Sequence, residues 1–318
     1  MSQTINDRPL LLHSQGRNAA DIPDHEIWDS LASHGAILFR GFGLDADGFY
    51  DVASRFSRGF LVSPFGDRKP ASDRNELQTV TVGQAGLSLH FEYGNSPLRP
   101  DLLWFYCRQA AADGTGGETL LADGAAIFER LRPETQDLLK ARRVKYRNFV
   151  PPDAFEAILS KNETVGSLVG PDVVGALSRT QDFRVMEASG NRVVFEFVAP
   201  SVRPIGDTGR MRVCQNMFTD AYKKPTDDEA DGSFSTLVTW EDGSEIAPEV
   251  LDDLKQVARS LTRGIRWQTG DFVLIDNNRM LHGRNQTSDP ARDIVMLSSF
   301  SSRFRLDTAP VGAAREGS

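Results

Sequence analysis

Residues 89–92 read Leu-His-Phe-Glu, and a second histidine, His282, follows the apolar run Phe-Val-Leu-Ile at 272–275. On an extended chain His90 and Glu92 point to one side, while Phe91 points to the other. Only a folded sheet could bring His282 to them. Two imidazoles and one carboxylate on one face are the ligands of mononuclear non-haem Fe(II) oxygenases, which keep other metal positions open. The spacing alone also fits a buried, hydrogen-bonded histidine.

The sequence around this stretch predicts a protein that is mostly β with flanking helices. Residues 102–107 form a nearly continuous apolar run, which is typical of a strand buried on both faces. Further strand-like runs cover 36–40, 144–149, 193–197, 211–217, 272–275 and 294–300. Helical spacing covers 22–32, 46–57 after an N-cap at Asp45, 125–140 with a second helix starting at Pro133, and 248–262.

The length of 318 residues is compatible with one large domain. Residues 151–207 have weak periodicity and several glycines and prolines, so we expect a long insertion there rather than an independent domain. We expect the C-terminal tail from about residue 308 to be frayed.

The charge and cysteine content of the chain limit the kinds of partner that we expect. Lys+Arg 36 against Asp+Glu 44 gives a net charge of −8, and the basic residues are scattered, which argues against a nucleic-acid or membrane partner. Cys107 and Cys214 are too few and too far apart for a disulfide framework, and we expect both to be reduced. No secretory leader or apolar span is evident, so we expect a cytoplasmic protein with a small-molecule substrate. A homo-oligomer remains open.

Several motifs occur in the order and spacing of one known family. These are Gly35–Gly41 (Gly-Ala-Ile-Leu-Phe-Arg-Gly), His90-Phe91-Glu92, Ser96-Pro97, Gly116-Gly117-Glu118-Thr119, Asp276-Asn277-Asn278-Arg279, His282-Gly283-Arg284 and Arg292. Together they span most of the chain. The combination resembles the Fe(II)/2-oxoglutarate-dependent oxygenases of the taurine dioxygenase and clavaminate synthase-like superfamily. Within it, the chain is most similar to the amino-acid hydroxylases of natural-product pathways.

The resemblance implies a double-stranded β-helix, or jelly-roll, core with helices outside. It makes His90, Glu92 and His282 the Fe(II) ligands and the catalytic centre. It makes Arg292 the bidentate partner of the distal carboxylate of the cosubstrate 2-oxoglutarate, a task that suits a guanidinium fork. Thr119 would support the same carboxylate, and O2 would be the oxidant.

Departures from the family pattern narrow the activity. Taurine-specific enzymes carry a second arginine where this chain has Met296, so a sulfonate held in that way is disfavoured. Related halogenases replace the metal carboxylate with Gly or Ala, so Glu92 argues against halogenation. Arg279 and Arg284 are open to two roles, strand-end salt bridges or cosubstrate contacts.

We therefore expect hydroxylation of an unactivated C–H bond in a small amino-acid-derived or peptide-like metabolite, with release of succinate and CO2. Desaturation, epoxidation or ring closure on the same scaffold is the first alternative. A catalytically silent jelly-roll binding protein is the second. Residues that we expect to line the substrate pocket, though core packing explains most of them equally well, are Gln78, Leu89, Phe91, Tyr93, Asn95, Asn216 and Phe218.

Overall fold

The structure is a computed structural model, and it describes residues 9–63, 68–80, 83–160, 162–189, 192–206, 208–219 and 234–303. The C-terminal tail that we expect to be frayed lies outside these residues. Within the described part of the chain, no helix is long and apolar enough to cross a membrane.

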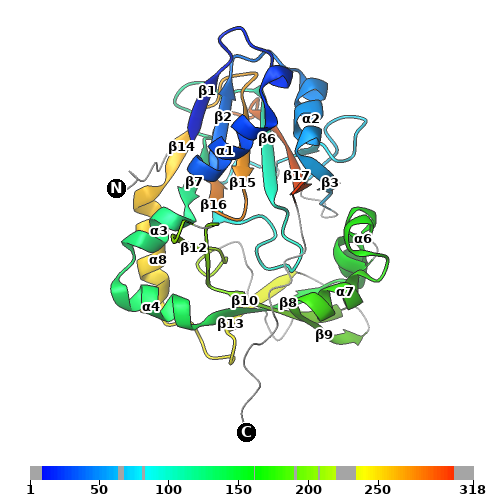
Figure 1. The fold of residues 1–318 in the computed structure, drawn as a ribbon, viewed down its shortest axis with the longest axis vertical. Helices are drawn as coiled ribbons and strands as arrows, with labels where there is room; N and C mark the ends of the chain where they lie inside the picture. The colour runs from blue at the N-terminus through cyan, green and yellow to red at the C-terminus, as the bar shows by residue number, and fades with distance from the viewer. Residues whose placement is uncertain are drawn as a thin grey trace.

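A seven-stranded sheet forms the first layer (Figure 1). Its strands, in spatial order, are β1 (Leu10–His13), β2 (Ala36–Arg40), β15 (Phe272–Asp276), β6 (Leu102–Gln109), β17 (Asp293–Ser301) and β3 (Ser57–Leu61), with β4 (Gln78–Thr79) also paired to β17. β1 pairs with β2 in parallel, and the other pairs are antiparallel.

A four-stranded antiparallel sheet forms the second layer and carries the two histidines of interest. Its order is β14 (Arg263–Ile265), β7 (Thr119–Asp123), β16 (Met280–Arg284) and β5 (Leu87–His90). Strands close in sequence alternate between the two sheets, since β5 and β7 lie in the second sheet and β6 lies in the first. This is the jelly-roll arrangement that the sequence predicts.

The apolar runs of the central strands are continuous because these strands are buried on both faces. In β6, Leu103, Phe105 and Cys107 belong to the core between the two sheets. The alternate residues Leu102, Trp104 and Tyr106 belong to the core between the first sheet and the helices outside it. The period of two along a strand thus fills two cores at once.

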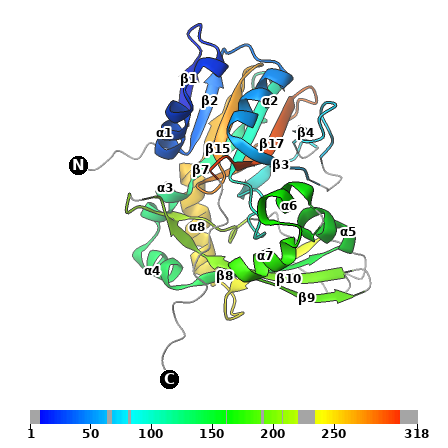
Figure 2. The same ribbon diagram turned by 45° about the vertical axis from the view of Figure 1, so that its right-hand side comes forward.

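Helices α1 (Asp24–His34) and α2 (Ala46–Arg55) cover the outer face of the first sheet (Figure 2). Asp45 caps α2 by accepting a hydrogen bond from the Gly48 amide at 2.9 Å. Pro133 and Pro248 each occupy a first helical position, in α4 (Pro133–Ala141) and α8 (Pro248–Leu261). The predicted helix starts at these three residues are therefore confirmed.

A third sheet lies at the opposite end of the molecule from α1 and α2 (Figures 1 and 2). Its antiparallel order is β13 (Ser235–Trp240), β8 (Arg143–Val150), β10 (Arg192–Pro200) and β9 (Asp182–Ser189). The remaining elements are η1 (Ala19–Asp21), α3 (Gly124–Arg130), α5 (Pro152–Phe155), η2 (Glu156–Ser160), α6 (Glu163–Val169), α7 (Val173–Thr180), β11 (Val202–Pro204) and β12 (Met211–Val213). Residues 151–207 therefore contain regular structure, including two strands of the third sheet.

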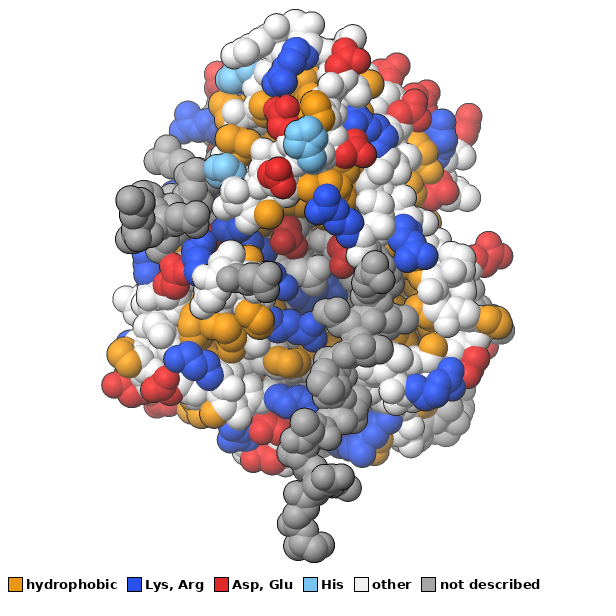
Figure 3. All heavy atoms as spheres, viewed as in Figure 1, with side chains coloured by type: hydrophobic (Ala, Val, Ile, Leu, Met, Phe, Trp, Pro, Cys, Tyr) orange, Lys and Arg blue, Asp and Glu red, His pale blue; other side chains and the backbone are white. Residues whose placement is uncertain are grey.

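The predicted strand over 211–217 is wrong beyond Val213, where β12 ends. Residues 214–217 belong to no strand, and the side chain of Asn216 is hydrogen-bonded to the backbone of Phe91, just after β5. Cys107 and Cys214 are both buried and do not form a disulfide with each other, and their reduced state stays a prediction. On the face shown in Figure 3, Lys and Arg side chains are interspersed with Asp and Glu.

Candidate active site

His90 and His282 lie directly opposite each other on the paired strands β5 and β16. Their ring centroids are 4.3 Å apart. The strands approach closely at Gly283, where a Cβ atom would lie 2.6 Å from the carbonyl oxygen of Leu87. A side chain at this position would push β16 away from β5, so the glycine beside His282 keeps the two imidazoles together.

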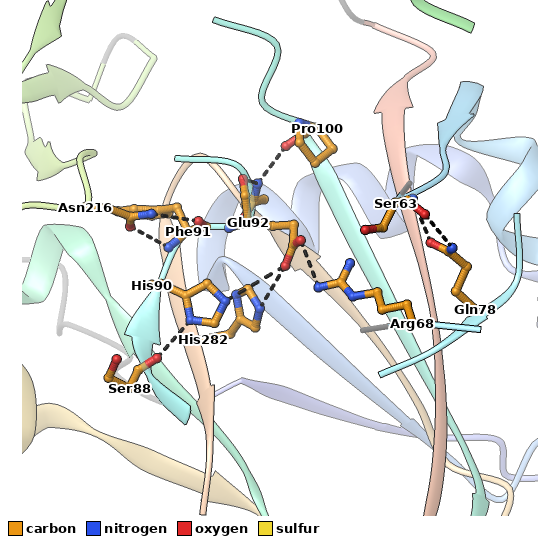
Figure 4. A network of polar contacts seen from close by, with 11 residues as sticks. Ser63, Arg68, Gln78, Ser88, His90, Phe91, Glu92, Pro100, Asn216 and His282 are labelled. Atoms are coloured by element: carbon orange, nitrogen blue, oxygen red, sulfur yellow. Dashed lines mark hydrogen bonds and ion pairs between the residues drawn. The ribbon is translucent and has the colours of Figure 1, made fainter. Parts of the chain in front are cut away.

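Glu92 brings a carboxylate to the same point from just beyond the end of β5 (Figure 4). Its Oε2 atom is 3.6 Å from Nε2 of His282 and 3.9 Å from Nε2 of His90. The side-chain amide of Asn277 fixes the Glu92 backbone, accepting from the amide nitrogen at 2.9 Å and donating to the carbonyl at 3.0 Å. The three ligand atoms lie within 4.8 Å of one another.

The hydrogen bonding of His90 leaves its Nε2 atom available as a ligand. Nδ1 lies 2.8 Å from the carbonyl oxygen of Ser88, which can only accept, so Nδ1 carries the proton. Burial and the neighbouring His282 lower the pKa of His90 to about 4. The ring is therefore neutral near pH 7, as a metal ligand must be.

Glu92 is ionised although it is buried. Burial alone would raise its pKa, but the Arg68 guanidinium and the two histidines hold the pKa well below its usual range. Arg68 Nη2 donates to Oε1 at 2.9 Å. The other oxygen, Oε2, is buried and accepts no hydrogen bond from the described residues. A buried carboxylate oxygen that faces two imidazoles is an arrangement that a divalent transition-metal ion satisfies.

The histidines open into a cavity whose wall is cationic. Arg284, Arg292 and Thr119 line it together with His90 and His282. Arg292 donates from Nε to the Gly117 carbonyl oxygen at 2.7 Å, and Thr119 Oγ1 accepts from the indole of Trp267 at 3.1 Å. Burial and the neighbouring Arg284 lower the pKa of Arg292 to about 10, so it stays charged near pH 7. Two guanidinium groups beside a metal site favour a small anion that chelates the metal.

The structure separates the two arginines that the sequence leaves ambiguous. Arg279 is buried against Asp123, with Nη2 2.7 Å from Oδ2, and also donates to the Ala32 carbonyl oxygen. Arg279 and Asp123 therefore form a buried ion pair with a structural role. Arg284 lies in the cavity wall and donates to the Ala85 carbonyl oxygen at 2.8 Å.

None of the seven residues that we expect to contact substrate is among the described residues that line this cavity. The amides of Gln78, Asn95 and Asn216 are hydrogen-bonded to Ser63, to Asn148 and to the Phe91 backbone, respectively. The apolar members lie in, or pack against, the core between the second and third sheets, and they are Leu89, Phe91, Tyr93 and Phe218.

Sequence reasoning missed several residues of the cavity wall. These are Arg68, Val80, Leu87, Phe105 and Gly283. Leu87 and Gly283 stand on the histidine strands, so their proximity could have been inferred from the strand pair. Arg68 stands in a stretch without periodicity, and nothing local predicts its position. Met296 also lines the cavity, so the residue that replaces the second arginine of taurine enzymes is an apolar part of the wall.

Comparison with known proteins places most of the chain in one family. Residues 7–298 match the family described as taurine catabolism dioxygenase TauD, TfdA family. A clavaminate synthase-like protein of Arabidopsis thaliana is 25% identical over 291 residues, covering 86% of this chain and 84% of the relative. The dapdiamide synthesis protein DdaC of Enterobacter agglomerans is 23% identical over 318 residues, covering 89% and 91%. A taurine dioxygenase from Burkholderia xenovorans superposes with a TM-score of 0.57 at 15% identity, covering 92% of this chain and 86% of the other.

Proposed function

This chain belongs to the TauD/TfdA family and is therefore an Fe(II)- and 2-oxoglutarate-dependent oxygenase, and from that premise we propose that it oxidises a C–H bond of a small amino-acid-derived or peptide-like metabolite in natural-product biosynthesis. Hydroxylation is the outcome that we favour, with release of succinate and CO2. The observation that carries the proposal is one cavity in which His90, His282 and Glu92 meet beside Arg292 and Thr119.

Each residue of the site has a proposed role. His90 and His282 would hold iron through Nε2, and Glu92 would hold it through Oε2. Arg292 would pair with the distal carboxylate of 2-oxoglutarate, and the Thr119 hydroxyl would donate to the same group while accepting from Trp267. Iron and 2-oxoglutarate bound there would, together with O2, supply the oxidising chemistry that removes a hydrogen atom from the substrate. The protein contributes orientation and a cavity that excludes water.

The substrate class rests on the cavity and on the relatives. The apolar Met296 in the cavity wall supports a substrate other than a sulfonate bound through a second arginine. Similarity to a dapdiamide synthesis protein supports a role in natural-product biosynthesis, and the amino-acid-derived substrate follows from the resemblance of the sequence to amino-acid hydroxylases. Desaturation, epoxidation and ring closure use the same metal and cosubstrate residues, so they stay as alternatives. A silent binding protein loses support, because the full ligand set and the cationic wall are present together.

Other expectations from the sequence remain predictions. They are the seven substrate contacts, the origin of residues 151–207 as an insertion and a cytoplasmic location, while the oligomeric state is left open. Since the amides of Gln78, Asn95 and Asn216 are already hydrogen-bonded, we propose that these residues act on substrate through the loops that they hold.

A screen for coupled succinate release tests the proposed function. Protein loaded anaerobically with Fe(II) and 2-oxoglutarate would be mixed with amino acids, their amides and short peptides, and then exposed to O2. We expect a subset of amino-acid-like compounds to raise succinate formation stoichiometrically with an oxidised product that mass spectrometry identifies. Equal succinate release with and without every amino-acid-like compound, together with coupled turnover of another class, would refute the substrate assignment.

A further inference from the structure

We propose that Arg68 restricts Glu92 to a single metal-binding oxygen and so keeps one position on the iron open for O2. Arg68 Nη2 donates to Oε1 of Glu92 at 2.9 Å, and the two side chains are only 10% and 8% exposed. Oε2 is the carboxylate oxygen that lies near both imidazoles (Figure 4). The inference deepens the proposed function and rests on its metal site.

The backbone around Glu92 is already fixed by two buried amides. Asn277 holds both backbone groups of Glu92, and Asn216 accepts from the Phe91 nitrogen at 2.7 Å and donates to the Phe91 carbonyl oxygen at 2.9 Å. What remains free is rotation of the carboxylate about its own side-chain bonds. The bond from Arg68 opposes that rotation, since turning Oε1 toward the metal would break a buried, charge-assisted hydrogen bond.

This restriction matters because carboxylates bind metal ions through either one or two oxygens. A six-coordinate metal held by His90, His282 and one oxygen of Glu92 would have room for two atoms of 2-oxoglutarate and for one molecule of O2. If Glu92 bound through both oxygens, that last position would be filled. Arg68 is therefore a positioning residue that acts through Glu92 on the number of open metal sites.

Two other roles for Arg68 would leave different signatures. As part of the cationic wall with Arg284 and Arg292, it would bind 2-oxoglutarate, and its removal would raise the KM for that cosubstrate. As a contact for an anionic substrate, it would set the KM for the substrate. With 2-oxoglutarate at saturating concentration, neither role changes how many water molecules the metal holds.

The test counts metal-bound water directly. Mn(II) replaces Fe(II) in the anaerobic complex with 2-oxoglutarate, and the broadening of its electron paramagnetic resonance lines by 17O-water reports the coordinated waters. Arg68→Met removes the donor and keeps the apolar stem, while Arg68→Lys keeps a charged donor. Arg74→Ala is the control, because Arg74 belongs to the same segment but is 45% exposed and pairs with Asp47.

We expect one bound water in the unmodified protein, in Arg68→Lys and in Arg74→Ala, and none in Arg68→Met. O2 consumption by Arg68→Met with Fe(II) should fall about 10–100-fold, with little change in the KM for 2-oxoglutarate. If Arg68→Met fails to fold, Arg68→Ala repeats the measurement.

One bound water in the folded Arg68→Met or Arg68→Ala protein would overturn the proposal, as would a selective rise in either KM with the water count unchanged. If the unmodified protein did not bind Mn(II) and 2-oxoglutarate, the proposed function itself would be overturned. The two failures are therefore distinguishable.

Discussion

Replacing Arg292 with alanine should weaken 2-oxoglutarate binding selectively. Arg292 is partly buried in the cavity wall, and its only hydrogen bond to the described residues uses Nε, which leaves both Nη groups for a carboxylate. Exposed ion pairs contribute about 0–1 kcal/mol, but this pair would be desolvated beside Arg284. Truncating one partner of a buried charge pair costs about 2–5 kcal/mol, which corresponds to a rise in KM of roughly 30- to 4,000-fold.

Steady-state succinate formation at varied 2-oxoglutarate and varied substrate separates the two KM values. Arg292→Lys should recover only part of the loss, because a point charge cannot form the two parallel bonds of a guanidinium. Arg266→Ala is the control, since Arg266 is exposed and close to Arg292 but lies outside the described residues that line the metal cavity. Equal increases in both KM values for Arg292→Ala would refute the reasoning and make Arg284 the next residue to test.

Three further outcomes follow from the site. Gly117→Ala should raise the KM for 2-oxoglutarate without abolishing metal binding, because the new Cβ would lie 2.7 Å from Cδ of Arg292 at a backbone φ of +86°; unchanged kinetics would contradict this. Asn277→Ala should lower the free energy of unfolding in urea by about 1–3 kcal/mol, and it should weaken metal binding measured by calorimetry, because the Asn277 amide holds the backbone of Glu92. Asn278 is the partly buried neighbour of Asn277, and Asn278→Ala should leave the metal affinity unchanged. With Glu92 as a third protein ligand, the unmodified enzyme should transfer no chloride even in high salt, and a chlorinated product in mass spectrometry would show that the coordination is different.

The fold was predictable where local patterns and burial agree. The run at residues 102–107 is apolar at every position because β6 contributes alternate residues to two cores. Helix starts at Asp45, Pro133 and Pro248 were predictable because a side-chain cap and a fixed proline φ act within one turn.

Long-range contacts account for what the sequence did not predict. β12 ends at Val213 rather than near residue 217, because the Asn216 amide is hydrogen-bonded to the Phe91 backbone on a distant loop. The short strand β1 is held by its pairing with β2. Its sequence has no alternation of apolar and polar residues that would predict a strand. Arg68 shows no periodic or spacing signal, so only the folded chain reveals its bond to Glu92.

The metal site likewise combines features that the sequence predicts with features that only the structure shows. His-x-Glu spacing alone favours a buried structural histidine over a metal ligand, and the motifs that follow it point to the oxygenase family. The structure adds the direct register of His90 with His282 and the close approach at Gly283. Neither can be read from either segment separately.

Anaerobic iron titration of the metal-ligand variants tests the central claim most directly. Iron bound to the desalted protein in the presence of 2-oxoglutarate would be measured by plasma emission for the unmodified protein, His90→Ala, Glu92→Ala and His282→Ala, with circular dichroism to confirm folding. The account predicts one iron per unmodified chain, and strongly reduced iron with no coupled succinate formation in each variant. Unchanged iron content and succinate release in all three variants would contradict it.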